Sequence, residues 1–339
     1  MLMNLETASP ELAPVSVAAS VEVEPVIWHR DVRITFASRL RLLPFRFLMK
    51  PLLGWMLSRG PRAIAGMQLR CASMRCPDTA GLPLDYRILG RVPGHVLGTL
   101  NPRGPVVLWL HGGAFVMPAA PNLHLVMVAR MCSELGAAGF VPDYRLAPFN
   151  RFPAALDDCE RAYRALLDCG YAPSQIVLGG DSAGANLVLG VLQRARARGL
   201  PMPSCAVALS PVTEMGRLHA PPSRHNRRGR DPLLPIKALH RVDEFYAGSW
   251  DASDPELSPL YMDCAGLPPM LFMASDTEIL LDDTLLLAAR AQAAGVETTC
   301  QIWPHFPHAF PLFEPYFPEV RPARDDIVAF ARSKLQVPA

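Results

Sequence analysis

The most constraining feature of the chain is a serine between two glycines, at the junction of two predicted elements. Residues 180–184 read Gly-Asp-Ser-Ala-Gly, after the apolar run Ile176 to Leu178 and before a stretch from Ala185 to Ala197 that is rich in alanine and leucine. The apolar run predicts a buried strand and the following stretch a helix. Glycines at both ends permit a sharp turn that lifts the Ser182 side chain clear of its neighbours. The pattern therefore indicates that Ser182 is a nucleophile.

A glycine-rich loop follows an earlier predicted strand. The apolar run at 106–110 leads directly into His-Gly-Gly-Ala at 111–114. A serine that attacks a carbonyl group generates an oxyanion, and backbone N–H groups stabilise it when they are in place before the reaction. We expect the amides of Gly112, Gly113 and Ala183 to be these donors.

The base is expected late in the chain, in the order serine, acid, histidine. His308 is the best placed of nine histidines, because it follows the predicted strand Thr298 to Trp303. The loop after that strand reaches the edge where the carboxyl ends of parallel strands meet. His305 is the alternative.

The acid should follow another buried strand, between the serine and the histidine. The run Pro269 to Ala274 predicts that strand. Four acidic residues come after it: Asp276, Glu278, Asp282 and Asp283. The last two begin a predicted helix, and we expect them to stabilise its N-terminus. Asp276 and Glu278 remain as candidates.

Four blocks between Leu84 and Leu335 resemble one family, the bacterial hormone-sensitive-lipase-like (family IV) esterases of the α/β-hydrolase fold. Residues 180–184 match the family's Gly-Asp-Ser-Ala-Gly, 144–148 match its Tyr-Arg-Leu-Ala-Pro, and 111–114 are similar to its His-Gly-Gly-Gly. Its acid motif, Asp-x-Leu-x-Asp followed by Asp or Glu, aligns with 278–283. The resemblance implies that Glu278 is the acid, where most members carry aspartate, and it departs at Ala114, where the family has a third glycine.

The resemblance implies a serine carboxylesterase that hydrolyses short- to medium-chain acyl esters through an acyl-enzyme intermediate. Ser182, Glu278 and His308 would form its triad, and no metal or organic cofactor is expected. A lactone hydrolase or an amide deacetylase would use the same groups and stays open. A non-catalytic protein that holds a small molecule on this scaffold is a more distant alternative.

Other residues near these motifs are expected to be structural. Asp231 lies in an Asp-Pro-Leu sequence that looks like an acid motif, but it precedes the strand at 269–274, so we interpret it as a turn and helix-start residue. We expect His111 to hold its loop, Asp181 to support the turn, and Arg145 to bind a nearby carboxylate.

Apolar runs and helical stretches alternate along the chain, which predicts a mostly parallel sheet with helices on both faces. Strands are expected near 85–89, 95–100, 106–110, 138–141, 176–178, 206–209, 269–274 and 298–303, and helices near 123–135, 154–168, 185–197, 235–246 and 281–294. We assign 81–212 and 251–339 to the catalytic core, 1–24 to a flexible arm, and 25–80 and 213–250 to two segments of a helical cap.

The segment from Val32 to Pro77 has an unusual charge pattern. It contains nine arginine or lysine residues and no aspartate or glutamate, among many large apolar residues. Prolines and cations interrupt it too often for a membrane span. We expect helices that cover the active site, and peripheral contact of Val32 to Pro77 with a membrane stays open. The arginine-rich stretch 224–230 is expected to be a solvated loop, and attraction of an anionic substrate or surface stays open.

Composition limits the partners and the location. Half of the 339 residues are hydrophobic, which suits one large core. A net charge of +2 offers no electrostatic reason to expect a nucleic acid, so the expected partner is a small-molecule ester, and a homodimer stays open. Eight cysteines without metal-binding spacing, and an N-terminus unlike a secretory signal, predict a reducing, cytoplasmic location.

Overall fold

The computed structural model describes residues 27–216 and 221–336, so the predicted arm at 1–24 lies outside the described residues. Within these ranges nine strands form one sheet in the order β1-β9-β8-β7-β6-β4-β5-β3-β2. The strands are β1 Ile27–His29, β2 Leu84–Leu89, β3 Val92–Leu97, β4 Val106–Leu110, β5 Ala138–Pro142, β6 Ile176–Asp181, β7 Cys205–Leu209, β8 Met270–Ser275 and β9 Thr298–Trp303. β2 and β3 pair antiparallel, β3 pairs antiparallel with β5, and the other neighbours are parallel.

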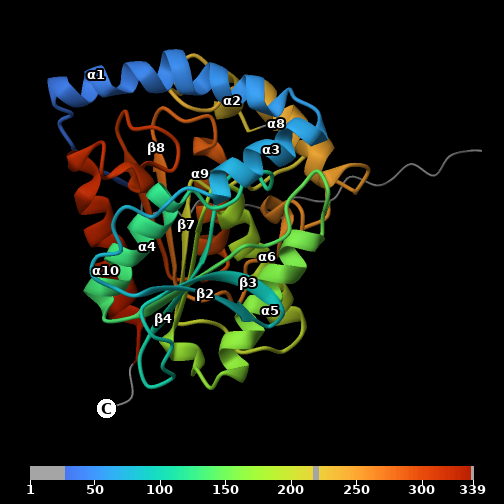
Figure 1. The fold of residues 1–339 in the computed structure, drawn as a ribbon, viewed down its shortest axis with the longest axis vertical. Helices are drawn as coiled ribbons and strands as arrows, with labels where there is room; N and C mark the ends of the chain where they lie inside the picture. Colours follow the sequence, from blue (N-terminus) through green and yellow to red (C-terminus); the bar gives the residue numbers. More distant parts are fainter. Residues whose placement is uncertain (1–26, 217–220, 337–339) are drawn as a thin grey trace, which may run out of the picture.

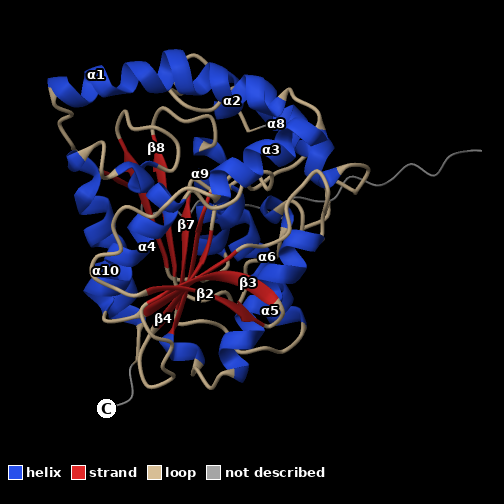
Figure 2. Cartoon of the chain, viewed as in Figure 1, coloured by secondary structure: helices blue, strands red, loops and turns tan. Residues whose placement is uncertain are grey.

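Helices cover both faces of this sheet (Figures 1 and 2). The α-helices are α1 Phe36–Pro44, α2 Lys50–Leu57, α3 Pro61–Ala72, α4 Val126–Leu135, α5 Ala154–Asp168, α6 Ala183–Ala197, α7 Ser223–Asn226, α8 Ile236–Val242, α9 Leu281–Ala293 and α10 Arg321–Lys334. Single π-helical turns are η1 Phe45–Met49, η2 Pro121–Leu125 and η4 Asp243–Ala247, and short 3₁₀ turns are η3 Pro173–Gln175, η5 Pro259–Tyr261, η6 Phe310–Phe313 and η7 Pro318–Val320. The predicted mostly parallel α/β fold is confirmed.

The alternation of side chains along β4 shows how the sheet separates two cores. Leu108 and Leu110 belong to the core on the side of α5, α6 and α9, whereas Val107 and Trp109 belong to the core with α4 and α10. All five residues of β4 are fully buried. Burial on both faces explains why this strand is a continuous apolar run in the sequence.

Two strands differ from the prediction. β3 begins at Val92 rather than His95, because Gly90 and Arg91 both have positive φ and form a two-residue hairpin turn that pairs Leu89 directly with Val92. β1 pairs in parallel with β9, although residues 25–80 are assigned above to the cap. This strand of three residues, with two of them exposed, is too short to show a periodic pattern.

The two segments expected to form a cap lie together over one end of the sheet. Figure 1 shows α1 and α2 crossing this end, with α8 beside α2 and α3 beneath them. The helix expected at 235–246 is present as α8 and continues through the π-helical turn η4. In the described ranges, no helix combines the length and the apolar character needed to cross a bilayer.

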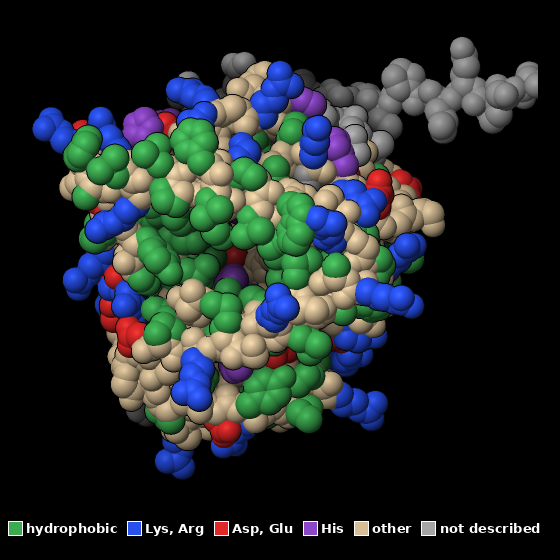
Figure 3. All heavy atoms as spheres, turned by 45° about the horizontal axis from the view of Figure 1, so that its top comes forward, with side chains coloured by type: hydrophobic (Ala, Val, Ile, Leu, Met, Phe, Trp, Pro, Cys, Tyr) green, Lys and Arg blue, Asp and Glu red, His purple; other side chains and the backbone are tan. Residues whose placement is uncertain are grey.

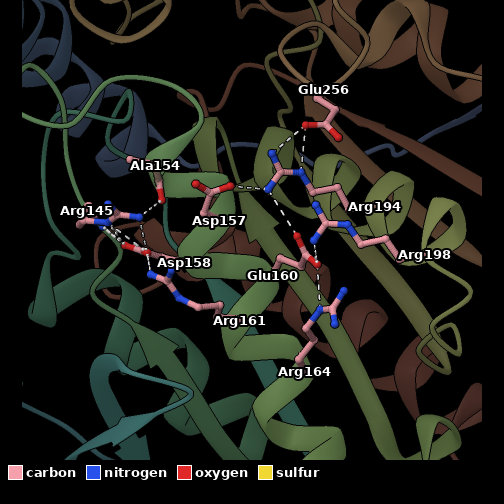
Figure 4. Close-up of polar contacts among 10 residues, drawn as sticks. All are labelled: Arg145, Ala154, Asp157, Asp158, Glu160, Arg161, Arg164, Arg194, Arg198 and Glu256. Atoms are coloured by element: carbon pink, nitrogen blue, oxygen red, sulfur yellow. Dashed lines mark hydrogen bonds and ion pairs between the residues drawn. The ribbon is translucent and has the colours of Figure 1, made fainter.

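A network of ion pairs fixes the loop at 144–148 to the helices behind the sheet (Figure 4). Arg145 is held by Asp158 of α5, whose Oδ2 accepts hydrogen bonds from the Arg145 Nε and backbone N–H, both at 2.9 Å. On α6, Arg194 reaches Asp157 at 2.6 Å and Glu256 at 2.7 Å. The network therefore joins α5, α6 and the chain that follows the second cap segment.

Candidate active site

Ser182 lies between β6 and α6, at the junction predicted from the sequence. Its backbone has φ 55° and ψ −119°, a conformation that costs a residue with a side chain about 1–3 kcal/mol. The Ser182 N–H donates to the carbonyl oxygen of Leu209 at 2.7 Å, which ties the turn to the end of β7. The surrounding structure thus maintains a strained turn that presents a half-buried serine.

Glycines are required here because three backbones are in contact. A Cβ atom on Gly184 would lie 1.9 Å from the carbonyl oxygen of Leu110, at the end of β4. A Cβ atom on Gly180 would lie 2.7 Å from that oxygen and from the backbone of Gly184. The two glycines therefore let β4, β6 and α6 meet at the turn.

Asp181 lies buried behind the turn and organises the loop beside it. Its carboxylate accepts hydrogen bonds from Trp109 Nε1 at 3.0 Å, from the Gly112 N–H at 3.1 Å and from His124 Nε2 at 3.3 Å. Burial alone would raise the pKa of Asp181, but the nearby His124 and these donors hold it below its ordinary value. Asp181 is thus a charged structural anchor.

The N–H of Gly112, an expected oxyanion donor, is therefore already bound to Asp181. The physical reason is the buried carboxylate, which approaches so closely that a Cβ atom on Gly112 would lie 2.2 Å from its Oδ2. The next two residues, Gly113 and Ala114, have φ of 120° and 57° and line the cavity above the turn. Ala183 begins α6, so its N–H has no acceptor within the helix. The amides left for an oxyanion are those of Gly113, Ala114 and Ala183.

His111 is fully buried and holds this loop to its neighbour. Its ring stacks on Tyr144 with centroids 4.3 Å apart, and its Nδ1 donates to the Gly112 carbonyl oxygen at 2.6 Å. The Tyr144 hydroxyl donates to the His111 carbonyl oxygen at 2.7 Å. Burial, together with the nearby His124, lowers the pKa of His111 to about 3, so the ring stays neutral.

The structure brings Glu278 and His308 together. The His308 Nδ1–H donates to Glu278 Oε2 at 3.2 Å, and both side chains are buried. Asp276 instead accepts a hydrogen bond from the backbone N–H of His305 at 2.7 Å, and His305 is exposed. The two alternatives left open by the sequence therefore bind each other, and neither of them lines the cavity above Ser182.

Ser210 was not identified from the sequence. It follows β7, has φ 47°, and its hydroxyl donates to Glu278 Oε2 at 2.8 Å. The Ser210 Oγ also accepts the N–H of Ala309 at 3.1 Å, so one serine contacts both Glu278 and the residue next to His308. The only sequence signal is a polar residue at the carboxyl end of a parallel strand.

Asp231 occupies the predicted turn before α8, and it also supports the acid. Its Oδ1 accepts the N–H groups of Leu233 and Leu234 at 2.7 and 2.8 Å. Its Oδ2 accepts the N–H of Ile279, next to Glu278, at 2.9 Å. Because Asp231 is fully buried, it fixes the second cap segment to the loop that carries the acid.

The charges of the buried pair affect each other. Burial raises the pKa of Glu278, even though the bonds from His308 and Ser210 oppose this shift. For His308, burial disfavours the imidazolium, but the hydrogen bond and the charge of Glu278 outweigh burial, and its pKa is raised above the ordinary value. The negative charge of Asp231 acts in the same direction on both groups.

Ser182 and His308 line one cavity, but no hydrogen bond joins them in this structure. The buried His308 Nε2 has no hydrogen-bond partner among the described residues. Such contacts between a nucleophile and its base are often long without substrate and tighten when substrate binds. His308 Nε2 at the cavity wall is thus available to accept a hydrogen bond from a hydroxyl group.

The cavity has a volume of about 480 Å³ and is mostly apolar. Its walls include Met56 and Ile64 of the first cap segment and Leu233 of the second. Figure 3 shows the opening as a hollow ringed by hydrophobic side chains, with histidine (purple) and acidic (red) side chains at its floor. In residues 27–216 and 221–336, no three His, Cys, Asp or Glu side chains cluster as they would around a metal ion.

Arg224 departs from the expected solvated loop, because its side chain is buried at the cavity wall. Its Nε donates to Asp283 Oδ2 at 3.0 Å and its Nη2 to the Glu214 carbonyl oxygen at 2.8 Å. Asp283 also accepts the N–H of Thr213 at 2.9 Å. The pair thus anchors the second cap segment to α9, since a buried guanidinium needs a charged partner.

Comparisons with known proteins agree on one family. The sequence profile of a family described as the alpha/beta hydrolase fold matches residues 107–312. The chain is 36% identical over 251 residues to an acetyl-hydrolase of Streptomyces hygroscopicus, covering 74% of this chain and 83% of that protein. It is 35% identical over 309 residues to the carboxylesterase/phospholipase LipF of Mycobacterium tuberculosis, covering 87% and 81%. The crystal structure of an esterase from the bacterial hormone-sensitive lipase family superimposes with a TM-score of 0.77 at 31% identity, covering 90% of this chain and all of that one.

The contact at Gly184 predicts a large loss of stability on adding one methyl group. In Gly184→Ala the Cβ atom would collide with the Leu110 carbonyl, and because this atom is backbone it cannot rotate away. We expect the variant to lose about 3 kcal/mol of unfolding free energy, measured by urea denaturation. Gly66→Ala on α3, where nothing lies within 4 Å, is the matched control and should be as stable as the wild type or slightly more. Equal stability of the two variants would contradict the proposed contact.

The hydrogen bonds of Asp231 to the turn before α8 and to Ile279 predict a kinetic effect of Asp231→Asn. An amide cannot accept hydrogen bonds on both of its terminal atoms, so either the Ile279 N–H or the turn before α8 loses its partner. We expect kcat to fall about tenfold, as is typical for a lost hydrogen bond of about 1.4 kcal/mol. The acid limb of the pH profile should also move to lower pH, because the charge that raises the His308 pKa is removed. Asp251→Asn, on an exposed loop, is the control and should change neither quantity.

Proposed function

The chain belongs to the α/β-hydrolase family and is an esterase of its hormone-sensitive-lipase-like branch, and on this basis we propose that Ser182, His308 and Glu278 are its catalytic triad. The observation that carries the proposal is the buried hydrogen bond between Glu278 and His308, in the wall of the cavity that Ser182 also lines. Each group follows the carboxyl end of a different parallel strand, as expected for a triad on this fold.

In the proposed mechanism Ser182 attacks the ester carbonyl while His308 Nε2 accepts its proton. Glu278 keeps the other ring nitrogen protonated and stabilises the imidazolium that forms. The amides of Gly113, Ala114 and Ala183 receive the oxyanion, with Ala114 in place of Gly112, whose N–H binds Asp181. His308 then protonates the leaving alcohol, and a water molecule that it activates releases the acid from Ser182.

We further propose that the acyl group of the substrate ester carries a short to medium alkyl chain. A largely apolar cavity of about 480 Å³ supports this proposal, because it falls in the usual range for sites that enclose a small ligand. Methionines on several sides of the cavity, including Met49, Met56 and Met215, can adapt to chains of different length. The names of the two relatives, an acetyl-hydrolase and a carboxylesterase/phospholipase, agree with an acyl substrate.

Three other expectations from the sequence stay predictions: a cytoplasmic location, a homodimer, and contact between Val32 to Pro77 and a membrane.

The triad predicts which substitutions abolish turnover. Ser182→Ala and His308→Ala should each lower kcat for p-nitrophenyl butyrate by about 10⁴-fold or more, and Glu278→Gln by about 10³- to 10⁴-fold. Asp276→Asn and His305→Ala are matched controls, because those residues bind each other away from the pair, and they should stay within about threefold of the wild type. If Asp276→Asn were inactive and Glu278→Gln active, the acid assignment would be overturned.

The shifted pKa of His308 predicts the acid limb of the activity profile. His308 must be neutral to accept the serine proton, so kcat/KM should fall as the pH drops through a pKa above the ordinary 6.5. In Glu278→Gln the partner that raises this pKa is removed while burial remains, so the limb should move to lower pH as the rate falls. Profiles of kcat/KM from pH 5 to 9 for both proteins measure this shift, and an unchanged or higher midpoint in the variant would contradict it.

A further inference from the structure

The first cap segment forms one continuous rod whose inner side is anchored to the protein. α1, η1 and α2 follow one another without a break from Phe36 to Leu57, a length of about 33 Å at 1.5 Å per residue. Phe45 packs edge-to-face on Phe313 with ring centroids 5.0 Å apart. Further along, Leu53 and Leu57 line the cavity. The residues on this inner side are spaced at intervals that fit one face of a helix, and their contacts hold the rod in position.

The outer side of the rod is also apolar. Phe36 is 76% exposed, Phe47 71% and Leu48 64%. Four more large apolar side chains on the rod are at least 40% exposed: Leu40, Leu43, Leu52 and Trp55. None of these seven side chains lines the cavity. A helix that is hydrophobic all round is normally buried, and an exposed patch of this extent normally marks a site of interaction.

Charge identifies the chemistry of the partner. Nine cations and no acidic residue lie between Val32 and Pro77. Arg39 of α1 is exposed next to Leu40, and Arg62 and Arg70 are exposed on α3. Arg41 donates to the backbone carbonyl oxygen of Tyr316, which does not neutralise its charge. The face therefore combines a hydrophobic centre with exposed positive charge, which suits an anionic lipid surface.

A second copy of the chain fits this face less well. In a twofold symmetric dimer the same patch meets itself, so the cations of one copy would lie against those of the other. Negative lipid head groups instead attract each cation by about 1 kcal/mol near the surface. The charge pattern thus favours a membrane over self-association.

We propose that the outer face of α1, η1 and α2 docks on an anionic lipid bilayer, with the rod lying in the interface. Phe47, Leu48 and Trp55 enter the boundary between head groups and acyl chains, and the arginines contact lipid phosphates. The inner side of the same rod lines the cavity that holds Ser182, so docking places the lipid surface against an element that covers the site. Docking does not depend on the catalytic residues, so the two proposals can fail separately.

Flotation with lipid vesicles tests the docking. The full chain and Ser182→Ala are each mixed with phosphatidylcholine vesicles, with or without phosphatidylglycerol, and centrifuged through a density gradient. Both proteins should float with the anionic vesicles, and raising the salt to about 0.5 M should reduce binding, because screening weakens the attraction of exposed charges. Equal flotation on neutral and anionic vesicles, or none on either, would overturn the proposal.

Variants locate the surface. Phe47→Ser with Leu48→Ser should lower the bound fraction on anionic vesicles about tenfold. Arg39→Glu on α1 should also lower it, because it reverses a charge on the docking face. Ile88→Ser on β2, where the side chain is 69% exposed at the opposite edge of the sheet, is the matched control and should bind as the wild type does.

Hydrolysis of soluble p-nitrophenyl butyrate should stay within about twofold in all these surface variants, since none of the changed side chains lines the cavity. This readout shows that they are folded. If the Phe47 and Leu48 variant floats as well as the wild type, the face is not the docking surface. If the wild type does not float but sediments as a dimer that this variant dissociates, the face is a contact between copies and the membrane proposal is wrong.

Discussion

The contact between the Leu110 carbonyl oxygen and the backbone of Gly184 is the constraint on which the rest of the site depends. It places the end of β4 against the start of α6, with no room for a side chain between them. The strained Ser182 and the loop at 111–114 are adjacent because of this contact, so the proposed nucleophile and the proposed backbone donors lie together. The cost of the strain is offset by the packing of a sheet whose central strands are fully buried.

Two buried carboxylates beside the turn behave in opposite ways. Asp181 accepts hydrogen bonds from three N–H donors, and its pKa is held low, so it remains a charged anchor. The pKa of Glu278 is raised by burial, and its Oε1 has no hydrogen-bond partner among the described residues. A carboxylate that is less completely stabilised interacts more strongly with the ring of His308. Equal burial therefore leads to a structural role in one case and to the proposed catalytic role in the other.

The cap connects the entrance of the cavity to its reactive groups. Asp231 of the second segment binds the amide next to Glu278, and Lys50 of α2 donates to the Asp231 carbonyl oxygen at 2.7 Å. Two hydrogen bonds therefore connect the first cap segment, through Asp231, to the residue that follows Glu278. The rod has an apolar outer face, lines the cavity with its inner face and is linked to the residue after Glu278. One element therefore connects the proposed docking surface to the proposed catalytic site.

The sequence by itself determined the α/β fold and most element boundaries, and it supplied the candidate site residues, because burial on both faces of a parallel sheet and a glycine-flanked serine leave strong local patterns. Only the tertiary structure showed that Glu278, rather than Asp276, contacts His308. It also showed that the Gly112 amide binds Asp181 and that Arg224 is buried against Asp283. Ser210 binds Glu278, and Asp231 binds the amide of the next residue. Those outcomes depend on hydrogen bonds between residues far apart in the chain. Such bonds leave no periodic trace in the sequence, since their geometry exists only once the strands have met.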